Sequence, residues 1–455
     1  MTIATAANEG TKIAATDRYA RSRDLSRRAS ESIAGGVVSL NRKVEPAIAF
    51  VRALGSRLWD ADGNEYIDYH AAFAPHLLGH NDREVNDAVR RAMDEGWSLT
   101  GSGTTPWEVR LSELLRRAVP SLERVQITVT GSEATAHAIR LSRAWTGRED
   151  VVVTMGGYNG WHNDVARTVM PSAAETGPSP ASGEFPFLPS SAGIPQGVRD
   201  RVHVVPFNDL DAIKKVLTRH PVACVLTEPV LQNIGVVPPR PGYLQGLRDL
   251  CSRLGVLCVF DEVKTGFRSA LGGYQSIAGV TPDLSVFAKA VANGWPLGLI
   301  GGRADVMGLV EDPDPARRVL ISGTYNAHPF PVAAAIATLE RLMRDDGEVH
   351  RRLEALGARL QAGLERLFRE AGRIATVSRI GSAFCVYFMD HIPVDWHDLA
   401  AAHDFDFDRR YRRELIDRGV YHFPLPCKQG SISAAHTEAD IDRTIEVTRE
   451  ALRSL

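Results

Sequence analysis

Two residues of opposite charge, Asp261 and Lys289, each follow an apolar run and could do chemistry together. Asp261 comes after GVLCVF in the stretch FDEVKTGFR, and Lys289 comes 28 residues later, after the run LSVFA. A carboxylate at the end of a buried strand is costly unless a cation pairs with it. A partly desolvated lysine has a lowered pKa and becomes a nucleophilic amine, although Lys289 taken alone could equally be a surface lysine with a buried stem.

Two turns offer further groups to a ligand. The turn TGSEA places Gly131 and Ser132 where a helix is predicted to begin. Free N–H groups, the positive end of the helix dipole and a hydroxyl form a site for an anion such as phosphate, although Ser132 could instead be only an N-cap with Glu133 in the first turn. The turn GGYNGWHN brings glycine backbone close to a ligand. Its Tyr158 could stack on a planar ring, or could simply pack in the core.

Taken together, these residues meet the requirements of a pyridoxal phosphate site. The lysine forms a Schiff base with the cofactor's aldehyde, and the carboxylate keeps the pyridine nitrogen protonated, so that the ring can take up electrons from the substrate. The TGSEA turn would anchor the phosphate. We therefore predict pyridoxal 5'-phosphate as the cofactor and no metal site.

The runs that carry these residues belong to a regular alternation of apolar and helical segments from Arg124 onward. The apolar runs are RVQITVT, DVVVTM, RVHVVPF, VACVLTEP, GVLCVFDEV and LSVFAKA. This alternation predicts an α/β fold with a mostly parallel sheet, whose ligands bind beyond the carboxyl ends of the strands. Earlier in the chain, SRLWDADGNEYIDY predicts a hairpin around Asp62-Gly63, and DREVNDAVRRAMDEG predicts an amphipathic helix.

The segment 170–198 interrupts this alternation because it is rich in Pro, Ser and Gly. It is too long for an ordinary connection, and we favour a functional lid over a disordered excursion. After Pro329, long charged helices and a few strands predict a second, smaller α+β domain. The predicted division is a polar tail and helix at 1–30, the N-terminal part of the small domain at 31–75, a large cofactor-binding domain at 76–329 and the C-terminal small domain at 330–455.

The composition argues against several other classes of protein. A chain of 455 residues exceeds what one compact core usually serves. The net charge of −2 gives no reason to expect a nucleic-acid or anionic-membrane partner. The five scattered cysteines lack metal or redox spacing, as expected for reduced thiols in the cytoplasm. No apolar run approaches the roughly 20 residues that span a bilayer, and the N-terminal stretch lacks a hydrophobic signal core.

Several stretches occur in an order that is typical of one family. They are WDADGNEYIDY, TGSEA, EPVLQNIGVVPPRPGYLQGLRDL, FDEVKTGFR, GVTPDLSVFAKAVANGWPLG, SGTYNAHP and AAHTEADID. With these stretches the chain resembles the class III pyridoxal-phosphate aminotransferases of fold type I. It is most similar to the glutamate-1-semialdehyde aminomutase branch, which also contains β-amino-acid aminotransferases. The resemblance implies a large domain with a mostly parallel, seven-stranded-type sheet sandwiched by helices, and a smaller α+β domain built from both termini.

The resemblance also implies roles for the cofactor-binding residues. Lys289 would be the Schiff-base lysine and Asp261 the partner of the pyridine nitrogen. The remaining contacts would be Gly131 and Ser132 at the phosphate, Tyr158 and Val263 on opposite ring faces, and Glu228 and Asn233 near the ring. Thr324, in SGTYNAHP, would reach the phosphate of the neighbouring subunit, which implies a homodimer with shared active sites.

The predicted substrate contacts include one marked departure from the aminomutases. In GGVVSLNRK, Ser39 and Arg42 occupy positions that contact the substrate there, and Arg42 is a candidate carboxylate clamp. The family's asparagine in NSGTEA is Val129 in this chain, and the histidine of its YHG is Asn159. Near the C-terminus, the aminomutases place a glutamate that meets the substrate amine or the lid, where this chain has Lys428. This reversal of charge favours a second anionic group on the substrate.

We therefore expect an aminotransferase that moves an amino group between a small-molecule donor and an oxo acceptor. Lys289 would act as general base and then as general acid. The alternative is an intramolecular aminomutase that acts on glutamate semialdehyde or a relative. The intact pair of Lys289 and Asp261 argues against a catalytically silent scaffold. A nicotinamide-dependent oxidoreductase is disfavoured because no G-x-G-x-x-G motif follows a strand in the expected context.

Overall fold

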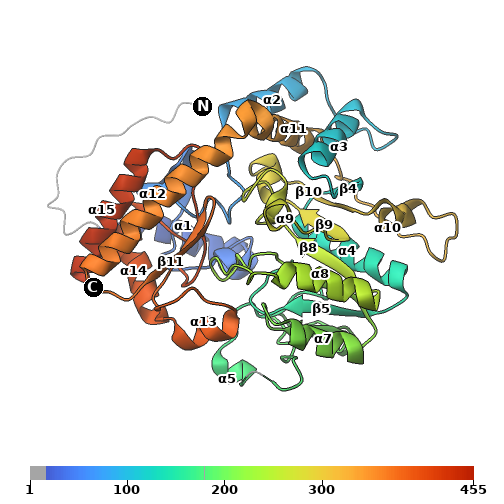
Figure 1. The fold of residues 1–455 in the computed structure, drawn as a ribbon. Coiled ribbons are helices and arrows are strands. Elements are labelled where there is room, and N and C mark those ends of the chain that lie inside the picture. Colours follow the sequence, from blue (N-terminus) through green and yellow to red (C-terminus); the bar gives the residue numbers. More distant parts are fainter. Residues whose placement is uncertain (1–16, 179) are drawn as a thin grey trace.

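The computed structural model describes residues 17–178 and 180–455 of the chain. Helices α12 (Glu348–Glu370), α14 (Phe405–Asp417) and α15 (Glu438–Ser454) gather on one side of the molecule, and a large sheet with its covering helices forms the other side (Figure 1). The helix expected near residue 20 is α1 (Ala20–Ser32). The first part of the predicted polar tail, residues 1–16, lies outside the described residues.

The large sheet has seven strands in the order β4-β10-β9-β8-β7-β5-β6. The strands are β4 (Arg124–Thr128), β5 (Asp150–Thr154), β6 (Val202–Val205), β7 (Val222–Thr227), β8 (Leu257–Asp261), β9 (Leu284–Phe287) and β10 (Gly298–Gly302). All the pairs from β6 to β9 are parallel, whereas β10 runs antiparallel to both of its neighbours. Every residue of β5 to β9 is buried, so both faces of the sheet are covered, as parallel sheets require. The predicted mostly parallel, seven-stranded sheet is thereby confirmed.

Strand β10 was not among the apolar runs that predict strands, because three of its five residues are glycine. The structure explains these glycines by close backbone contact. A Cβ added to Gly298 would lie 2.5 Å from the carbonyl group of Thr130, and one added to Gly302 would lie 2.2 Å from the carbonyl oxygen of Asp283. The strand therefore depends on residues that have a low propensity for strands.

Two smaller sheets complete the fold. One has the order β1-β2-β3-β13 and joins β1 (Phe50–Leu54), β2 (Arg57–Asp60) and β3 (Glu65–Asp68) to β13 (Val420–Tyr421). The other consists of β11 (Thr376–Ile380), β12 (Ala383–Tyr387) and β14 (Gly430–Ser431). The first sheet contains strands from both ends of the chain, and its antiparallel β2–β3 pair confirms the predicted hairpin.

The remaining helices cover the sheets or pack on one another. The longer ones are α2 (Arg83–Asp94), α3 (Pro106–Ala118), α4 (Gly131–Thr146), α7 (Leu210–Arg219), α8 (Tyr243–Leu254) and α11 (Pro329–Met343). The shorter ones are α5 (Ala173–Thr176), α6 (Gln196–Arg199), α9 (Gly273–Ala278), α10 (Ala304–Met307) and α13 (Trp396–Ala402). The amphipathic helix predicted from DREVNDAVRRAMDEG is α2. Among the helices of the described chain, none is long and apolar enough to cross a membrane.

The segment 170–198 lies beside the edge strand β6 and contains α5 and α6. Phe185 forms a bridge with Val204 of β6, and the indole of Trp396 donates a hydrogen bond of 2.9 Å to the carbonyl of Pro171. The segment is thus tied both to the large sheet and to α13. Its function as a lid stays a prediction.

Candidate active site

A cavity of about 270 Å³ opens where β4, β5, β8 and β9 end. This is the edge of a parallel sheet at which ligands are expected to bind. Six of the predicted site residues line the cavity, namely Gly131, Ser132, Tyr158, Asp261, Val263 and Lys289. The structure therefore brings together residues that are separated by more than half of the large domain in sequence.

One wall of the cavity is the N-terminus of α4. Thr130 is the N-cap of this helix and forms a capping box with Glu133, so the alternative in which Ser132 is the N-cap is wrong. The first N–H groups of a helix have no partner within it, which leaves the amides of Gly131 and Ser132 at the cavity wall. A Cβ on Gly131 would lie 2.9 Å from Val263, so this approach requires glycine. The wall has the features of an anion site.

Asp261 is the last residue of β8, and its carboxylate is buried. The carboxylate accepts a hydrogen bond of 2.8 Å from the side-chain amide of Asn159 and one of 3.1 Å from the backbone N–H of Val263. Burial, followed by the nearby charge of Glu228, raises the pKa of Asp261 to about 7. In the part of the chain that the structure describes, no cation donates a hydrogen bond to it. A bound cation here would restore its usual charge.

Lys289 follows β9 and begins a short 3-10 turn, Lys289–Ala292. Its φ is +50°, a left-handed conformation that is unusual for a residue with a side chain and typical of functional sites. Burial lowers the pKa of Lys289, and the charges of Asp261 and Glu228 oppose this effect. The amines of the buried Lys264 and the half-buried Lys428 donate to backbone carbonyls at 2.8 and 2.7 Å, whereas no described residue accepts a hydrogen bond from Lys289. Its amine is therefore free to react.

Glu228 and Asn233 lie behind the turn that carries Tyr158. Glu228 follows β7 and accepts hydrogen bonds from the backbone N–H of Tyr158 and the side-chain amide of Asn233, both at 2.8 Å. Burial, and then the charge of Asp261, raises the pKa of Tyr158. Glu228 thus fixes the turn of the tyrosine, and the predicted contacts of Glu228 and Asn233 with a ring remain predictions.

Asn159 and Arg167 belong to the site but were not among the predicted site residues. The buried guanidinium of Arg167 donates to the carbonyl of Thr154 at 2.6 Å and to the side-chain oxygen of Asn159 at 3.3 Å. Because this contact occupies the amide oxygen of Asn159, its amide N–H₂ points at Asp261. The sequence marked Asn159 only as a departure from the family motif, and no local signal distinguishes Arg167 from a surface arginine.

Like Glu228 and Asn233, four further predicted residues do not line this cavity. Thr324 is exposed, and Arg42 lies in the exposed 3-10 turn Leu40–Arg42 directly after Ser39. Lys428 is half-buried; its amine donates to the carbonyl of Asn233 and contacts the sulfur of Met170 at 3.0 Å. Burial lowers the pKa of Lys428 to about 8. The roles of these four residues remain predictions.

The second carboxylate of FDEVKTGFR has a structural role. The side chain of Glu262 is buried and accepts hydrogen bonds from the backbone N–H groups of Tyr274 and Gln275, at 2.9 and 2.8 Å. It also accepts a short hydrogen bond from Thr265. Glu262 thus holds the start of α9 and points away from the cavity.

The cavity fits pyridoxal phosphate in three respects. The start of α4 offers backbone N–H groups, and a Cβ on its first residue, Gly131, would collide with Val263. Asp261 is a buried carboxylate that lacks a cation, which the protonated ring nitrogen would supply. Lys289 presents a free amine to the same cavity. Gly131 and Ser132 would hold the phosphate, and Tyr158 and Val263 would enclose the ring.

Comparisons with known proteins agree with this arrangement. Residues 39–423 match the model of the class-III aminotransferases. The chain is 38% identical over 447 residues to the glutamate-1-semialdehyde 2,1-aminomutase of Symbiobacterium thermophilum, covering 97% of this chain and 99% of that protein. An omega-transaminase from Sphaerobacter thermophilus superposes with a TM-score of 0.87 at 31% identity, covering 95% of this chain and 97% of the other. A β-phenylalanine aminotransferase from Variovorax paradoxus gives a TM-score of 0.81 at 30% identity, covering 96% and 95%.

Proposed function

Because the chain belongs to the class-III aminotransferase family, whose members depend on pyridoxal phosphate, we propose that it transfers an amino group from a small-molecule donor to a separate oxo acceptor. The observation that carries the proposal is the shared cavity of Lys289 and Asp261. Transaminases are also among its structural relatives at TM-scores of 0.87 and 0.81.

The chain's own residues would bind the cofactor and move one proton. When bound, pyridoxal phosphate supplies a ring that takes up electrons from the substrate's α-carbon. Asp261, held by Asn159 and by the N–H of Val263, would keep a positive charge on the ring nitrogen. The amine of Lys289, once released by the donor, would accept a proton from the substrate's α-carbon and deliver it to the carbon of the cofactor's former aldehyde group. Its lowered pKa increases the fraction of neutral amine that can accept the proton.

Lys428 favours intermolecular transfer over the aminomutase reaction. A glutamate at this position of the aminomutases would favour a substrate amine, whereas the amine of Lys428 favours a carboxylate. The amine contacts Met170, at the start of the segment 170–198, and the carbonyl of Asn233, whose side chain binds Glu228. It therefore connects the predicted lid with the residues that hold the turn of Tyr158. We propose that Lys428 and Arg42 select substrates with a carboxylate, with Ser39 beside them.

A single-turnover experiment distinguishes the proposal from the aminomutase alternative. The enzyme is mixed with a panel of amine donors, with and without an added oxo acid, and the cofactor absorbance is followed. An aminotransferase should stop after one half-reaction when the oxo acid is omitted, and should turn over when it is present. Sustained turnover of glutamate semialdehyde without any oxo acid would overturn the proposal in favour of the aminomutase, which the 38% identity to such an enzyme makes the second candidate.

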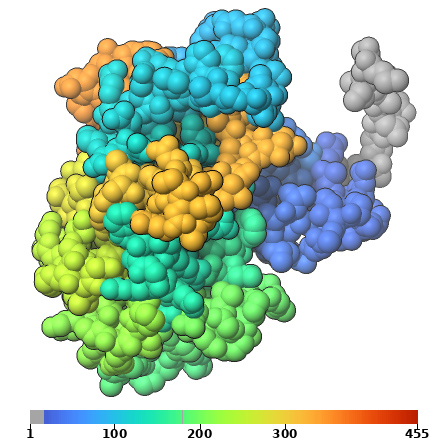
Figure 2. Space-filling view, turned by 90° about the vertical axis from the view of Figure 1, so that its right-hand side faces the viewer, coloured from blue at the N-terminus to red at the C-terminus, as the bar shows by residue number. Residues whose placement is uncertain are grey.

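We further propose a homodimer in which Thr324 of each subunit completes the partner's site. Thr324 is exposed and does not line the cavity of its own chain. Large apolar side chains are exposed near it and near the N-terminus, namely Val38, Leu40, Leu320 and Tyr325. Figure 2 shows that the chain just beyond residue 300 (amber) and the N-terminal segment (blue) occupy one face of the molecule. This face suits a subunit interface.

Mixed dimers test the shared site. Lys289→Ala and Thr324→Arg subunits should each be inactive alone. In a mixed dimer, one site carries both changes and the other carries neither, so activity should return. Failure of mixed dimers to regain activity would contradict the shared site. We also propose a cytoplasmic location, because all five cysteines are free and buried; cell fractionation tests this.

A further inference from the structure

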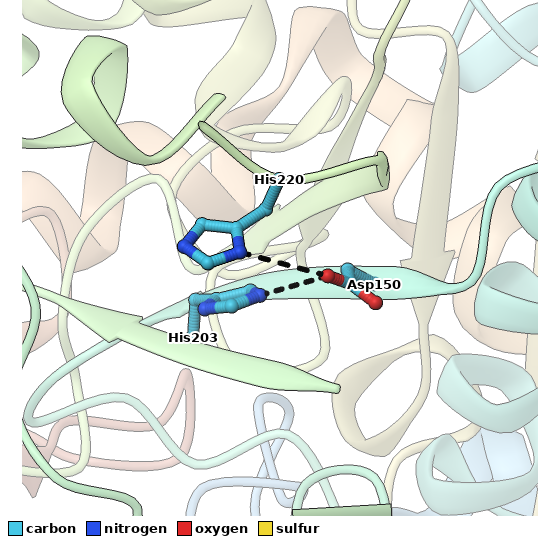
Figure 3. Close-up of side chains that lie close together, drawn as sticks. All are labelled: Asp150, His203 and His220. Atoms are coloured by element: carbon cyan, nitrogen blue, oxygen red, sulfur yellow. Dashed lines mark hydrogen bonds and ion pairs between the residues drawn. The ribbon is translucent and has the colours of Figure 1, made fainter. Parts of the chain in front are cut away.

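Four ionisable side chains meet at the end of the large sheet that is opposite to the cavity. Asp150 is the first residue of β5, His203 lies in the edge strand β6, and His220 directly follows α7. Glu184 reaches the same place from the segment 170–198. Figure 3 shows the two imidazole rings one above the other, each with one nitrogen directed at Asp150. None of these four residues lines the cavity.

The distances place three potential ligand atoms around a common point. Oδ2 of Asp150 lies 3.1 Å from Nε2 of His203 and 4.0 Å from Nδ1 of His220 (Figure 3). The second distance is too long for a hydrogen bond. Two ligands of one tetrahedral zinc ion are about 3.4 Å apart, because zinc–ligand bonds are about 2.1 Å long. The distances of 3.1 and 4.0 Å from Oδ2 of Asp150 to the two ring nitrogens lie on either side of this ligand–ligand distance. The three ligand atoms all lie within 4.8 Å of one another.

Glu184 approaches the two rings from their other side. Its carboxylate oxygens lie within hydrogen-bond distance of both rings, 2.8 Å from Nδ1 of His203 and 3.3 Å from Nε2 of His220. A carboxylate in this position holds the N–H of a histidine, so that the lone pair of the other ring nitrogen faces the metal. Glu184 thus orients both rings toward Asp150 at once.

With both rings neutral, as metal binding requires, the cluster has fewer N–H groups than nitrogen–oxygen contacts. Four nitrogen–oxygen contacts join two carboxylates to two imidazoles, but two neutral imidazoles carry only two N–H groups. With two neutral rings, at most two of these contacts are N–H···O hydrogen bonds. If both N–H groups point at Glu184, the remaining lone pairs of the two rings and Oδ2 of Asp150 face a common point. A cation at that point would be attracted by all three atoms.

A second cluster with the same kinds of groups shows the contrast. His403, Asp408 and Cys427 are also close together and fully buried. There the backbone N–H of Phe388 donates to Nδ1 of His403 at 3.1 Å, so the ring carries its proton on Nε2 and donates it to Asp408 at 3.2 Å. The guanidinium of Arg412 satisfies the other oxygen of Asp408 at 2.7 Å. Each of these hydrogen bonds has one donor and one acceptor, so the second cluster is satisfied without a bound ion.

We propose that Asp150, His203 and His220 bind a divalent transition-metal ion of the zinc type, with Glu184 as the supporting carboxylate. Imidazole and carboxylate are the donors such ions take, and a water molecule would fill the fourth position. His220 is 33% exposed at its side chain, which gives the ion a path to the site. Because Glu184 belongs to the segment 170–198, the ion would fasten that segment to the edge of the sheet.

The neighbouring charges leave the ligand atoms free. Arg201 contacts the other oxygen of Asp150, Oδ1, at 3.2 Å, and also pairs with Glu149. Arg219 lies 3.9 Å from Oε1 of Glu184. Both guanidiniums are partly exposed, so solvent screens their repulsion of a bound ion. Oδ2 of Asp150 remains available for the metal.

Zinc titration of the holoenzyme tests the site. The tag-free protein is treated with a chelator, dialysed and titrated calorimetrically with ZnCl₂, and its melting temperature is measured with and without the ion. The wild-type protein should bind one ion per chain and melt at a higher temperature with zinc. His220→Gln should weaken binding by at least tenfold and abolish the rise. Glu184→Gln should weaken it by about 10- to 100-fold, the usual effect of losing a supporting carboxylate.

His391→Gln is the matched control. His391 also lies between two carboxylates, Asp390 and Asp398 at 2.6 and 3.0 Å, but among residues 17–178 and 180–455 no second histidine pairs with these carboxylates. This variant should bind zinc as the wild type does. The proposal is overturned if the wild-type protein takes up no zinc, or if both His220→Gln and His203→Gln bind it with unchanged affinity. Comparing variants that all retain pyridoxal phosphate removes any contribution of the cofactor to metal binding.

Discussion

Replacing Asp261 by asparagine should change the pH dependence of stability of the cofactor-free protein. Burial and the charge of Glu228 raise the pKa of Asp261 to about 7, well above its ordinary value of 3.8. An acid whose pKa is raised on folding holds its proton more tightly in the folded than in the unfolded chain. Its contribution to stability is therefore largest below the unfolded pKa and is lost as the pH rises toward 7.

The expected change in the free energy of unfolding depends on the pH range in which Asp261 is protonated in the folded chain but ionised in the unfolded chain. One pH unit corresponds to 1.36 kcal/mol, so the wild-type protein should lose about 3 kcal/mol between about pH 5 and about pH 8 through this group. Asparagine has the shape of the protonated acid and does not titrate. The stability of Asp261→Asn relative to the wild type should thus rise by about 3 kcal/mol across this interval.

Urea unfolding of the cofactor-free proteins at the two pH values measures this difference. Asp283→Asn is a suitable control, because Asp283 is also a buried aspartate but is held by Arg248 and Arg303 at 3.1 and 2.8 Å. That variant should be less stable than the wild type by a similar amount at both pH values. Loading with pyridoxal phosphate should favour the wild-type protein over Asp261→Asn, because the carboxylate then faces a cation. Parallel pH profiles for the wild type and Asp261→Asn would refute the reasoning.

Three further changes test other parts of the site. Asn159→Leu removes the hydrogen bond to the carboxylate of Asp261, which is worth about 1.5–3 kcal/mol. The half-reaction, followed by cofactor absorbance, should therefore slow by about 10- to 100-fold. An unchanged rate would contradict the orienting role of Asn159. Gly131→Ala should weaken cofactor affinity in a binding titration by about tenfold or more, because its Cβ would lie 2.9 Å from Val263, and a second change, Val263→Ala, should recover part of it. The pKa of Lys428 is about 8, so the KM for an acceptor with a second carboxylate should rise above that pH in the wild type and stay level in Lys428→Met; equal pH profiles would remove Lys428 from substrate selection.

Much of the large domain could be predicted from the sequence, because its strands are continuous apolar runs between helical patterns. The runs after Arg124 correspond to β4 to β9. Strand β10 could not be recognised in this way, because its glycines are dictated by neighbouring backbone rather than by burial of side chains. The hairpin around Asp62-Gly63 was predictable because its signal is local.

The cofactor-binding residues could be predicted to the extent that they stand at strand ends. Asp261 and Lys289 follow such runs, and the structure places both on one cavity. Arg167 could not be found, because its role depends on three carbonyl and amide oxygens that the fold brings together. The cluster of Asp150, His203 and His220 could not be predicted from the sequence either, because its members lie far apart in the chain and match no metal-binding spacing.

Reduction of the holoenzyme with borohydride tests the central claim most directly. The reduced protein is digested, and the peptide that carries the mass of the cofactor is identified by mass spectrometry. In the wild-type protein, we expect the added mass on Lys289. In Lys289→Ala, we expect no peptide that carries the mass of the cofactor, and turnover should be lost. Cofactor mass on Lys264 or Lys428 instead, or unmodified Lys289 in a protein that retains full activity, would contradict the assignment of the active site.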